Sequence, residues 1–277
     1  MNAMSPTQFD YLRDMIHRES AIVLDLDKEY LVESRLAPIA RREGLASVAD
    51  LVQRLVSKPV ASLRAQVVDA MTTNETSFFR DVHPWQTMRA QIIPDLLAAR
   101  AKTRTLNIWC AACSSGQEPY SLAMLLLDEF PEIVAEWNVR IVATDLSATM
   151  VERCLAGTFS QLEVNRGLTE PQLQRHFVRS GNSWQISDDV RRMVEVHAAN
   201  LAVPSSIPRM GGIDLVLLRN VLIYFDDISK ERILSSIHRQ MKSDSYLMLG
   251  SSEVSTGTAT GFERCRSGRT IYFRRTH

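Results

Sequence analysis

The sequence lacks an excess of charge of either sign, and it lacks a long apolar run. Its 277 residues include 32 Lys and Arg and 32 Asp and Glu, so the formal net charge is zero. A protein that binds bulk nucleic acid or an anionic membrane normally carries a basic excess, so we expect neither partner. The longest clean apolar run is Leu122–Leu127, whereas a membrane-spanning helix needs about 20 apolar residues.

Cysteine is scarce, and several catalytic signatures are missing. The four cysteines, Cys110, Cys113, Cys154 and Cys265, are too few and too unevenly spaced for a disulfide framework. Cys110 and Cys113 form a C-x-x-C pair, but a zinc site needs further ligands, so we expect no metal. The sequence has neither an H-x-x-x-H pair nor a G-x-S-x-G elbow. We recognise no signal peptide and expect a cytoplasmic protein.

The apolar pattern is helical up to about residue 103. In residues 1–80, apolar side chains recur at spacings of three and four, which is the period of a helix. Gly44 and Pro59 supply stops between such stretches. We therefore predict an all-helical N-terminal domain over 1–80 and a linker helix over 81–103.

From residue 104 onward, short apolar runs alternate with helical stretches. This alternation over 104–277 predicts an α/β domain with a parallel, Rossmann-like sheet and helices on both faces. The last apolar run, 270–273, has no helix before it, so we expect it to join the sheet antiparallel. Residues 157–192 interrupt the alternation and predict a small β insertion with a hairpin near 177–187.

Polar features follow the first two predicted strands, at the sheet edge where ligands bind in open parallel sheets. The stretch Trp109–Tyr120 reads WCAACSSGQEPY, in which only Gly116 is glycine, so the dinucleotide fingerprint is absent. Glu118 would repel a pyrophosphate but suits a cationic group, such as the amino group of an amino-acid-like cofactor; alternatively, it is a helix-terminal carboxylate without a ligand. Asp145 fits either a ribose-binding acid or a helix N-cap.

The stretch Met71–Asp81 lies where the helical part meets the α/β part. Thr72 and Glu75 have the spacing of a capping box, which is one explanation of the motif. Junctions between domains are also common places for ligand clefts. The capping box leaves three polar side chains unexplained: Asn74, Thr76 and Arg80.

A further constellation, Leu218–Phe225, follows the buried run that we predict as the fourth strand. Arg219 and Asn220 come abruptly after that run, at the carboxyl end of the sheet. Tyr224 is a polar-tipped aromatic in an otherwise apolar turn. It is either a functional residue or, with Phe225, packing for the following helix.

Together these motifs resemble the CheR-type chemotaxis receptor methyltransferases over nearly the whole chain. The resemblance implies a methyltransferase sheet behind the helical domain, with S-adenosylmethionine as methyl donor and S-adenosylhomocysteine as product. It implies a receptor glutamate carboxylate as acceptor, so that a glutamate methyl ester forms. The matching stretches are Thr73–Arg80, Trp109–Ser121, Ala143–Ser147, Asn200–Leu201 and Arg219–Phe225.

The resemblance also implies cofactor-binding residues in the first half of the α/β part. Asn74, Thr76 and Arg80 would line the cofactor side of the cleft. Glu118 would face the amino-acid end of the cofactor, and Asp145 would hold its ribose hydroxyls. Arg80 is also a candidate catalytic residue, because its planar fork can orient a carboxylate, either the cofactor's or the substrate's.

In the second half, the same resemblance assigns Asn200 and Leu201 to the border of the adenine. Arg219 and Asn220 would close the pocket near the sulfonium. Tyr224 would stand near the transferred methyl and is the second candidate catalytic residue, acting through its ring or its hydroxyl.

The implied partners are the cytoplasmic methylation helices of chemotaxis receptors. Arg35, Arg41 and Arg42 of the helical domain face either these acidic helices or only solvent. Some members of the family tether to a receptor pentapeptide through the β insertion. Here the stretch Phe177–Trp184 leaves little room for an extended glycine-bearing loop, so we expect no such tether. We expect a monomer.

Three functions other than receptor methylation are compatible with parts of the sequence. A methyltransferase of another acceptor needs only the α/β half, and the helical domain and the 73–80 motif argue against it. A nicotinamide-dependent oxidoreductase is disfavoured by the missing glycine fingerprint and by Glu118. A non-catalytic protein that senses the cofactor is disfavoured because both Arg80 and Tyr224 are present.

Overall fold

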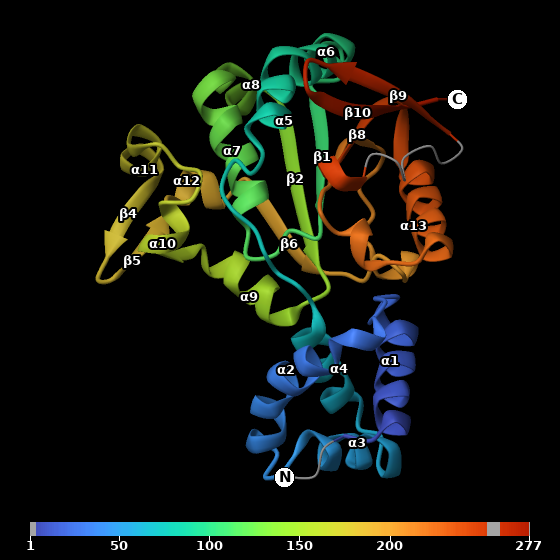
Figure 1. Cartoon of the computed structure of the whole chain (residues 1–277). Coiled ribbons are helices and arrows are strands. Elements are labelled where there is room, and N and C mark those ends of the chain that lie inside the picture. The colour runs from blue at the N-terminus through green and yellow to red at the C-terminus, as the bar shows by residue number, and fades with distance from the viewer. Residues whose placement is uncertain (1–3, 254–260, 277) are drawn as a thin grey trace. The chain divides into compact units, whose positions relative to one another are not determined.

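The structure of the chain is a computed structural model in which residues 4–253 and 261–276 are described. The chain forms two compact units (Figure 1): the first contains residues 1–73 and 224–229, and the second contains 74–223 and 230–277. The predicted domains also include residues 1–3, 254–260 and 277, which lie outside the described residues.

The first unit is all-helical, as predicted. Ser5 begins the first helix with a capping box to Gln8, and the Ser47 side chain caps the third. Gly44, at φ +71°, lies just beyond the end of the second helix, in a conformation that glycine adopts without strain. The apolar faces of the helices share one core that includes Leu12, Leu36 and Leu51. The helices are α1 Pro6–Ser20, α2 Glu29–Arg42, α3 Val48–Ser57 and α4 Ala61–Met71, with a 3₁₀ turn at Leu26–Lys28.

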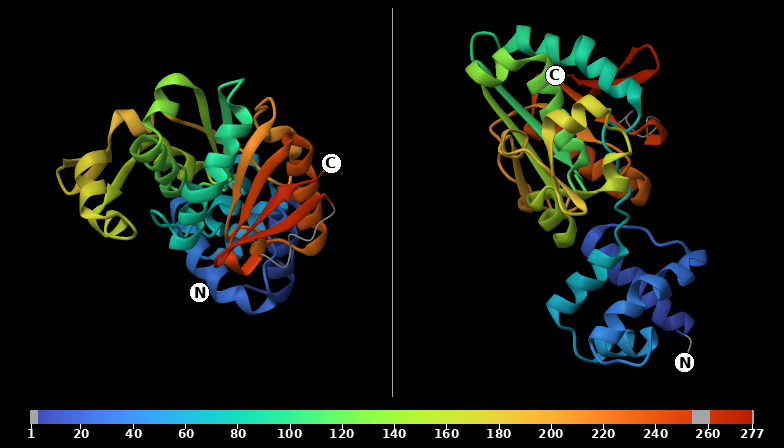
Figure 2. Two further views of the ribbon diagram at one scale, coloured as in Figure 1. Left: turned by 90° about the horizontal axis from the view of Figure 1, so that it is seen from above. Right: turned by 90° about the vertical axis from the view of Figure 1, so that its left-hand side faces the viewer.

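The second unit contains a seven-stranded sheet with the order β6-β2-β1-β7-β8-β10-β9. Strands β6, β2, β1, β7 and β8 are parallel, whereas β10 pairs antiparallel with β8, as predicted, and β9 with β10. The left view of Figure 2 shows these last strands side by side in orange and red. The strands are β1 Thr105–Ala111, β2 Asn138–Asp145, β6 Val194–Ala198, β7 Ile213–Leu218, β8 Met241–Leu249, β9 Phe262–Ser267 and β10 Thr270–Arg275.

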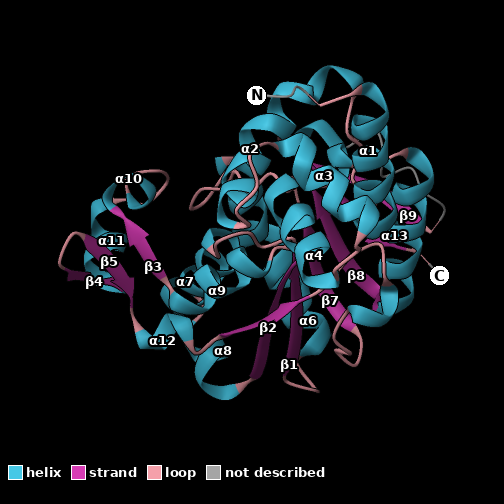
Figure 3. Cartoon of the chain, turned by 90° about the horizontal axis from the view of Figure 1, so that it is seen from below, coloured by secondary structure: helices cyan, strands magenta, loops and turns pink. Residues whose placement is uncertain are grey.

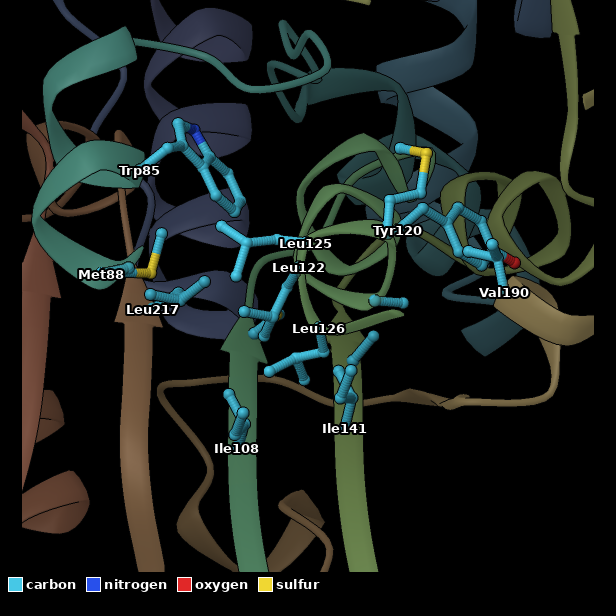
Figure 4. Close-up of a cluster of buried hydrophobic side chains, with 14 of the residues drawn as sticks. Trp85, Met88, Ile108, Tyr120, Leu122, Leu125, Leu126, Ile141, Val190 and Leu217 are labelled. Carbon is cyan, nitrogen blue, oxygen red and sulfur yellow. The ribbon is translucent and has the colours of Figure 1, made fainter. Parts of the chain in front are cut away.

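The helices of the second unit pack on this sheet. Figure 4 shows Trp85 and Met88 pointing toward Leu125 and Leu122 of α7, and toward Leu217 of β7. The residues around 82–100, predicted as a linker, thus belong to the core of the α/β unit, because their apolar face is buried on it. The helices are α5 Val82–Thr87, a π-helical turn Met88–Ile92, α6 Ile93–Arg100, α7 Gln117–Glu129, α8 Pro131–Glu136, α9 Ala148–Ala156 and α13 Asp227–Gln240.

The β insertion forms a separate three-stranded antiparallel sheet with the order β3-β5-β4 (Figure 3). Its hairpin, predicted near 177–187, turns at Gly181, which has φ +59°. We call residues 157–192 the β-subdomain. Its elements are β3 Thr158–Ser160, α10 Gln161–Val164, α11 Glu170–His176, β4 Phe177–Ser180, β5 Ser183–Ile186 and α12 Asp188–Arg191.

The boundary between the compact units lies between Thr73 and Asn74, seven residues before the predicted end of the helical domain at residue 80. The reason is that Phe78 is fully buried in the core of the α/β unit. Within the described residues, none of the helices combines the length and the apolarity that crossing a bilayer requires.

Candidate active site

The loop after β1 folds back onto the end of β2. Three residues of this loop have positive φ: Ala112 at 62°, Ser114 at 50° and Gly116 at 100°. The backbone N–H of Ser114 donates to Asp145 Oδ2 at 2.7 Å. At Gly116 an added Cβ would lie 2.7 Å from the Sγ of Cys154, so packing as well as φ requires glycine. Non-glycine residues with left-handed backbone conformations are strained, and such residues cluster at functional sites.

Asp145 organises the edge of the sheet. The residue is 7% exposed, and its Oδ1 accepts from the backbone N–H of Ser147 at 2.9 Å. Its own carbonyl accepts from the N–H of Ala199, which follows β6. The N-cap of α9 is the side chain of Ser147, which accepts from Met150 N. Of the two roles weighed for Asp145, the helix cap therefore falls to Ser147, and the Asp145 carboxylate instead joins the loops after β1 and β2.

The segment Asn74–Asp81 runs irregularly across these loops. The Asn74 carbonyl accepts from Ser114 Oγ at 2.9 Å, and the N–H of Phe79 donates to Ser121 Oγ of α7 at 2.9 Å. Phe79 has φ +44° and Asp81 has φ +60°. These contacts place Asn74 beside the loop after β1 and Phe79 beside α7. Thr76 and Arg80 lie in the same segment.

The capping box considered for Thr72 and Glu75 does not form. Residues 73–77 have no helical structure, and the next helix begins only at Val82. The Thr72 hydroxyl donates instead to the Asp69 carbonyl at 2.7 Å, at the end of α4.

Arg219 lies at the centre of a buried charge cluster after β7. Its side chain is 1% exposed, and Nη1 donates to Glu118 Oε2 at 3.0 Å. Its Nη2 donates to Asp81 Oδ2 at 3.0 Å and to the Arg80 carbonyl at 2.9 Å. Burial raises the pKa of the Glu118 carboxyl, and the nearby Arg219 guanidinium opposes that shift. Glu118, expected to face a cation, thus already has one in Arg219.

Glu253, which the sequence reasoning missed, holds the turn after β7. It is 1% exposed, and its Oε2 accepts from the backbone N–H groups of Asn220 and Gly250, both at 2.7 Å. Its Oε1 accepts from the N–H of Ile223 at 3.3 Å. The signal that could have indicated it is an acid shortly after the apolar run of β8, since Asp145 likewise lies at the end of a strand.

Two buried polar atoms of this turn have no hydrogen-bond partner among the described residues. They are Nε of Arg219, a donor, and Oδ1 of Asn220, an acceptor. Buried polar groups are almost always paired, so such orphans call for an explanation. An amino-acid-like group carries both an ammonium donor and a carboxylate acceptor. The methionine end of S-adenosylmethionine is such a group, and the atoms present therefore fit it.

The remaining predicted site residues are Asn200, Leu201, Tyr224 and the side chain of Arg80. Asn200 and Leu201 follow β6, and Leu201 is buried; Asn200 Oδ1 accepts from the N–H of Ala202 at 2.9 Å. Tyr224 belongs to the helical unit, where its carbonyl accepts from Val23 N. The Arg80 side chain is half-buried and donates to the Glu75 carbonyl at 2.8 Å.

The cysteines near the site are buried thiols. Burial raises the pKa of Cys110, and a hydrogen bond with Cys154, together with burial, raises that of Cys113. Thiols with raised pKa values stay protonated at neutral pH and react poorly. Across residues 4–253 and 261–276, no group of three or more His, Cys, Asp or Glu side chains is placed to hold a metal ion.

Two of the three arginines considered for receptor binding have partners inside the helical unit. Arg35 donates to the carbonyls of Met71 and Thr72 at 2.9 and 2.7 Å, at the end of α4. Arg42 donates to Gln66 Oε1 at 2.6 Å. The guanidinium groups of Arg35 and Arg42 therefore serve the fold of this unit.

Comparison with known proteins covers both units. The family profile described as "CheR methyltransferase, SAM binding domain" matches residues 74–271, and "CheR methyltransferase, all-alpha domain" matches residues 7–72. The chain is 40% identical over 266 residues to "Chemotaxis protein methyltransferase Cher2" of Pseudomonas putida, covering 94% of this chain and 95% of that protein. It is also 40% identical over 270 residues to "Chemotaxis protein methyltransferase 1" of Pseudomonas aeruginosa, covering 96% and 97%. The chain belongs to the CheR methyltransferase family, and its α/β unit is an S-adenosylmethionine-binding domain.

Proposed function

We propose that the protein transfers the methyl group of S-adenosylmethionine to glutamate carboxylates of chemotaxis receptors, giving glutamate methyl esters. The observation that carries this proposal is the match over both units to proteins named chemotaxis protein methyltransferases. A match limited to the α/β unit would support methyl transfer to any acceptor. The helical unit matches the all-alpha domain of the same family, and this second match favours a receptor as the substrate. We place the reaction on the cytoplasmic part of that receptor.

The chemistry needs little proton transfer from the protein. A glutamate side chain has a pKa of about 4.3, so it is already ionised at neutral pH and can act as a nucleophile. When bound, the cofactor supplies a methyl group on a sulfonium, which is an activated leaving group. The protein therefore has to align the acceptor carboxylate with the methyl group and exclude water. The site suits this task, since the carboxylates of Asp145, Glu118 and Glu253 are held in place by backbone N–H groups or by Arg219.

The cofactor-binding assignments follow from the arrangement at the sheet edge. We assign the ribose hydroxyls to Asp145, at the end of β2, and the amino-acid end of the cofactor to Glu118, Arg219 and Asn220. The orphaned Nε of Arg219 and Oδ1 of Asn220 support the second assignment. The other residues assigned to the cofactor are Asn74, Thr76, Arg80, Asn200 and Leu201.

Arg80 and Tyr224 are the proposed catalytic residues. The Arg80 guanidinium is only half-buried, and its Nη1 donates to the Glu75 carbonyl. Its remaining N–H groups form a fork that matches a carboxylate. Tyr224 is assigned to the region of the transferred methyl. We propose that the enzyme works as a monomer on receptor methylation helices and without a pentapeptide tether.

The test is transfer of tritium-labelled methyl from S-adenosylmethionine to a cytoplasmic receptor fragment, followed by mild alkali. Label that is released as methanol supports the proposal, and label that resists alkali overturns it in favour of another acceptor. Binding of S-adenosylhomocysteine without any labelling of receptor fragments would overturn the receptor assignment. The variant that tests the site is Asp145→Ala. We expect about a 10- to 100-fold loss of labelling, which corresponds to the loss of a hydrogen bond to a charged group.

A further inference from the structure

A loop of the β-subdomain lies directly against the segment Asn74–Arg80, although some 90 residues separate them in sequence. Gly167 has φ +101°, and a Cβ added there would lie 1.7 Å from the Phe78 carbonyl oxygen and 2.7 Å from the Phe78 carbonyl carbon. Non-bonded carbon and oxygen atoms normally stay about 3.3 Å apart or more. Any side chain at residue 167 must therefore push the backbone of Phe78 away.

The ring of Phe78 is held by the same subdomain. It is fully buried, and it packs edge-on against Phe159 of β3 and Phe177 of β4, with ring centroids 5.0 and 5.5 Å apart. Edge-to-face contacts of this kind favour one relative orientation of the rings. The β-subdomain thus fixes both the backbone and the side chain of Phe78.

The same loop makes an ion pair with the segment. Arg166 Nη2 donates to Glu75 Oε1, and the two side chains are 50% and 55% exposed. This bond lowers the pKa of the Glu75 carboxyl. Exposed pairs contribute little to stability, so we regard the pair as an auxiliary contact and the close approach at Gly167 as the main one.

The residue after Phe78 is strained, which shows why support is needed. Phe79 has φ +44°, a conformation that is rare for a bulky residue. Such a residue keeps that conformation only when its surroundings over-determine it. Here Ser121 of α7 binds the Phe79 N–H on one side, and the β-subdomain holds Phe78 on the other.

We propose that the β-subdomain positions the cofactor-lining segment Asn74–Arg80, with Gly167 as the positioning residue. The inference rests on the proposed role of this segment in the reaction. It gives the subdomain a task in the catalytic unit itself, whichever partner binds to its outer surface. Because a misplacement of about 1 Å can reduce a reaction rate about 100-fold, displacing Phe78 should disturb Asn74, Thr76 and Arg80 together.

The test compares Gly167→Ala with Gly181→Ala in the full chain. Gly181 also lies in the β-subdomain at positive φ, +59°, but has no atom within 4 Å of an added Cβ. Both variants place alanine at positive φ, but +59° lies in the left-handed region that alanine can adopt, whereas +101° lies outside it. Gly167→Ala therefore adds backbone strain in the loop as well as the clash with Phe78. The readouts are the Kd for S-adenosylhomocysteine by calorimetry, kcat and KM for methyl transfer, and the circular dichroism spectrum.

We expect Gly167→Ala to keep its spectrum, to bind S-adenosylhomocysteine about 10-fold more weakly or worse, and to lose about 100-fold in kcat. Gly181→Ala should stay within about 2-fold of the wild type in Kd and kcat, because its turn lies far along the hairpin from the segment. Equal Kd and kcat values for the two variants would overturn the proposal. Because the Kd needs no receptor, a failure of the proposed function leaves this comparison intact.

If Gly167→Ala does not fold, Arg166→Gln tests the second contact between this loop and the segment, the ion pair with Glu75, without a clash. We expect it to raise the Kd for S-adenosylhomocysteine about 2- to 3-fold. Arg192→Gln, which removes an exposed pair with Asp189 in the same subdomain, should leave that Kd unchanged. No difference between these two variants would then overturn the proposal.

Discussion

Strand β7 has a buried charge cluster at each end, and the two clusters differ in how completely their polar atoms are paired. At the amino end, Asp214 is fully buried, and its Oδ1 accepts from Arg100 Nε at 2.6 Å. Both of its oxygens also accept from Lys242 Nζ at 2.9 Å, and Oδ2 accepts from Asn107 N. Arg100 binds Asp244 with its remaining nitrogens. The charges of Arg100 and Lys242 therefore balance those of Asp214 and Asp244.

At the carboxyl end, Arg219 faces the carboxylates of Glu118 and Asp81, and Glu253 accepts from nearby backbone N–H groups. Here the Arg219 Nε and the Asn220 Oδ1 have no partner among the described residues, whereas the residues of the amino-end cluster leave no such atom. The amino-end cluster is thus paired within itself, as a structural cluster is. In the proposed function, the carboxyl-end cluster would use its two unpaired atoms to bind the cofactor.

The largest expected effect is on stability, from Asp214→Asn. Removing this charge leaves Arg100 and Lys242 without their buried partner, and breaking a buried pair costs about 3–5 kcal/mol of unfolding free energy. Urea unfolding measures this loss. The folded variant should bind S-adenosylhomocysteine as the wild type does, and a large change in that Kd would contradict a purely structural role. Asp189→Asn, at an exposed pair, is the control and should cost less than about 1 kcal/mol.

Glu253→Gln should affect both stability and binding. The variant loses an ionised acceptor for the N–H groups of Asn220 and Gly250, and hydrogen bonds to charged groups contribute about 1.5–3 kcal/mol. We expect a loss of that size in urea unfolding and about a 10-fold weaker S-adenosylhomocysteine complex, since the Asn220 turn is released. Glu263→Gln, on the exposed face of β9, is the matched substitution and should change neither quantity. Unchanged cofactor affinity would show that Glu253 serves the fold alone.

Arg219→Lys should change binding more than stability. Lysine keeps the charge near Glu118 but lacks the planar fork that reaches Glu118, Asp81 and the Arg80 carbonyl together. We expect about a 10-fold rise in the Kd for S-adenosylhomocysteine, measured by calorimetry. The comparison would break down if the conservative variant destabilised the fold as strongly as Asp214→Asn does.

The smallest expected effect is on the pH dependence of stability, to which Glu118 and Asp244 should contribute with opposite signs. Burial raises the pKa of Glu118, so the folded state takes up this proton more readily than the unfolded state, and stability gains as pH falls through the raised pKa toward 4.5. The bond to Arg100 lowers the pKa of Asp244, so its contribution is present above the ordinary value of 3.8 and is lost as pH falls below it. Each of the variants Glu118→Gln and Asp244→Asn should lose one of these two contributions, as measured by urea unfolding at several pH values. If both variants changed the dependence of unfolding free energy on pH in the same direction, the two opposite contributions would be contradicted.

The sequence predicts the main elements because burial leaves a plain apolar pattern. The apolar stretches Gln117–Glu129 and Ile213–Leu218 form a helix and a strand of the predicted α/β alternation. Strand β9 escaped prediction, since Glu263, Arg264 and Arg266 point to solvent along an edge strand. The short strand Thr158–Ser160 gives too few residues for a period to show.

The site was harder to predict than the fold. Residues directly after strands, such as Asp145 and Arg219, are visible as polar side chains at the ends of apolar runs. Their partners are not, because the bonds from Asp145 to Ser114 and from Arg219 to Asp81 join residues 31 and 138 positions apart. Gly167 gave no local signal at all, since the atom that excludes a side chain belongs to Phe78.

The backbone strain described at the sheet edge also bears on the order of folding. Among the described residues, five of the seven non-glycine residues with positive φ flank this edge: Phe79, Asp81, Ala112, Ser114 and Asn220. Left-handed conformations cost about 1–2 kcal/mol each in an unsupported chain, so these loops cannot order before their supports exist. One support, Glu253, follows β8 and is therefore synthesised after the five parallel strands of the sheet. During translation the site should consequently not form before Glu253 has left the ribosome, and a nascent chain should acquire cofactor affinity only after that residue is exposed.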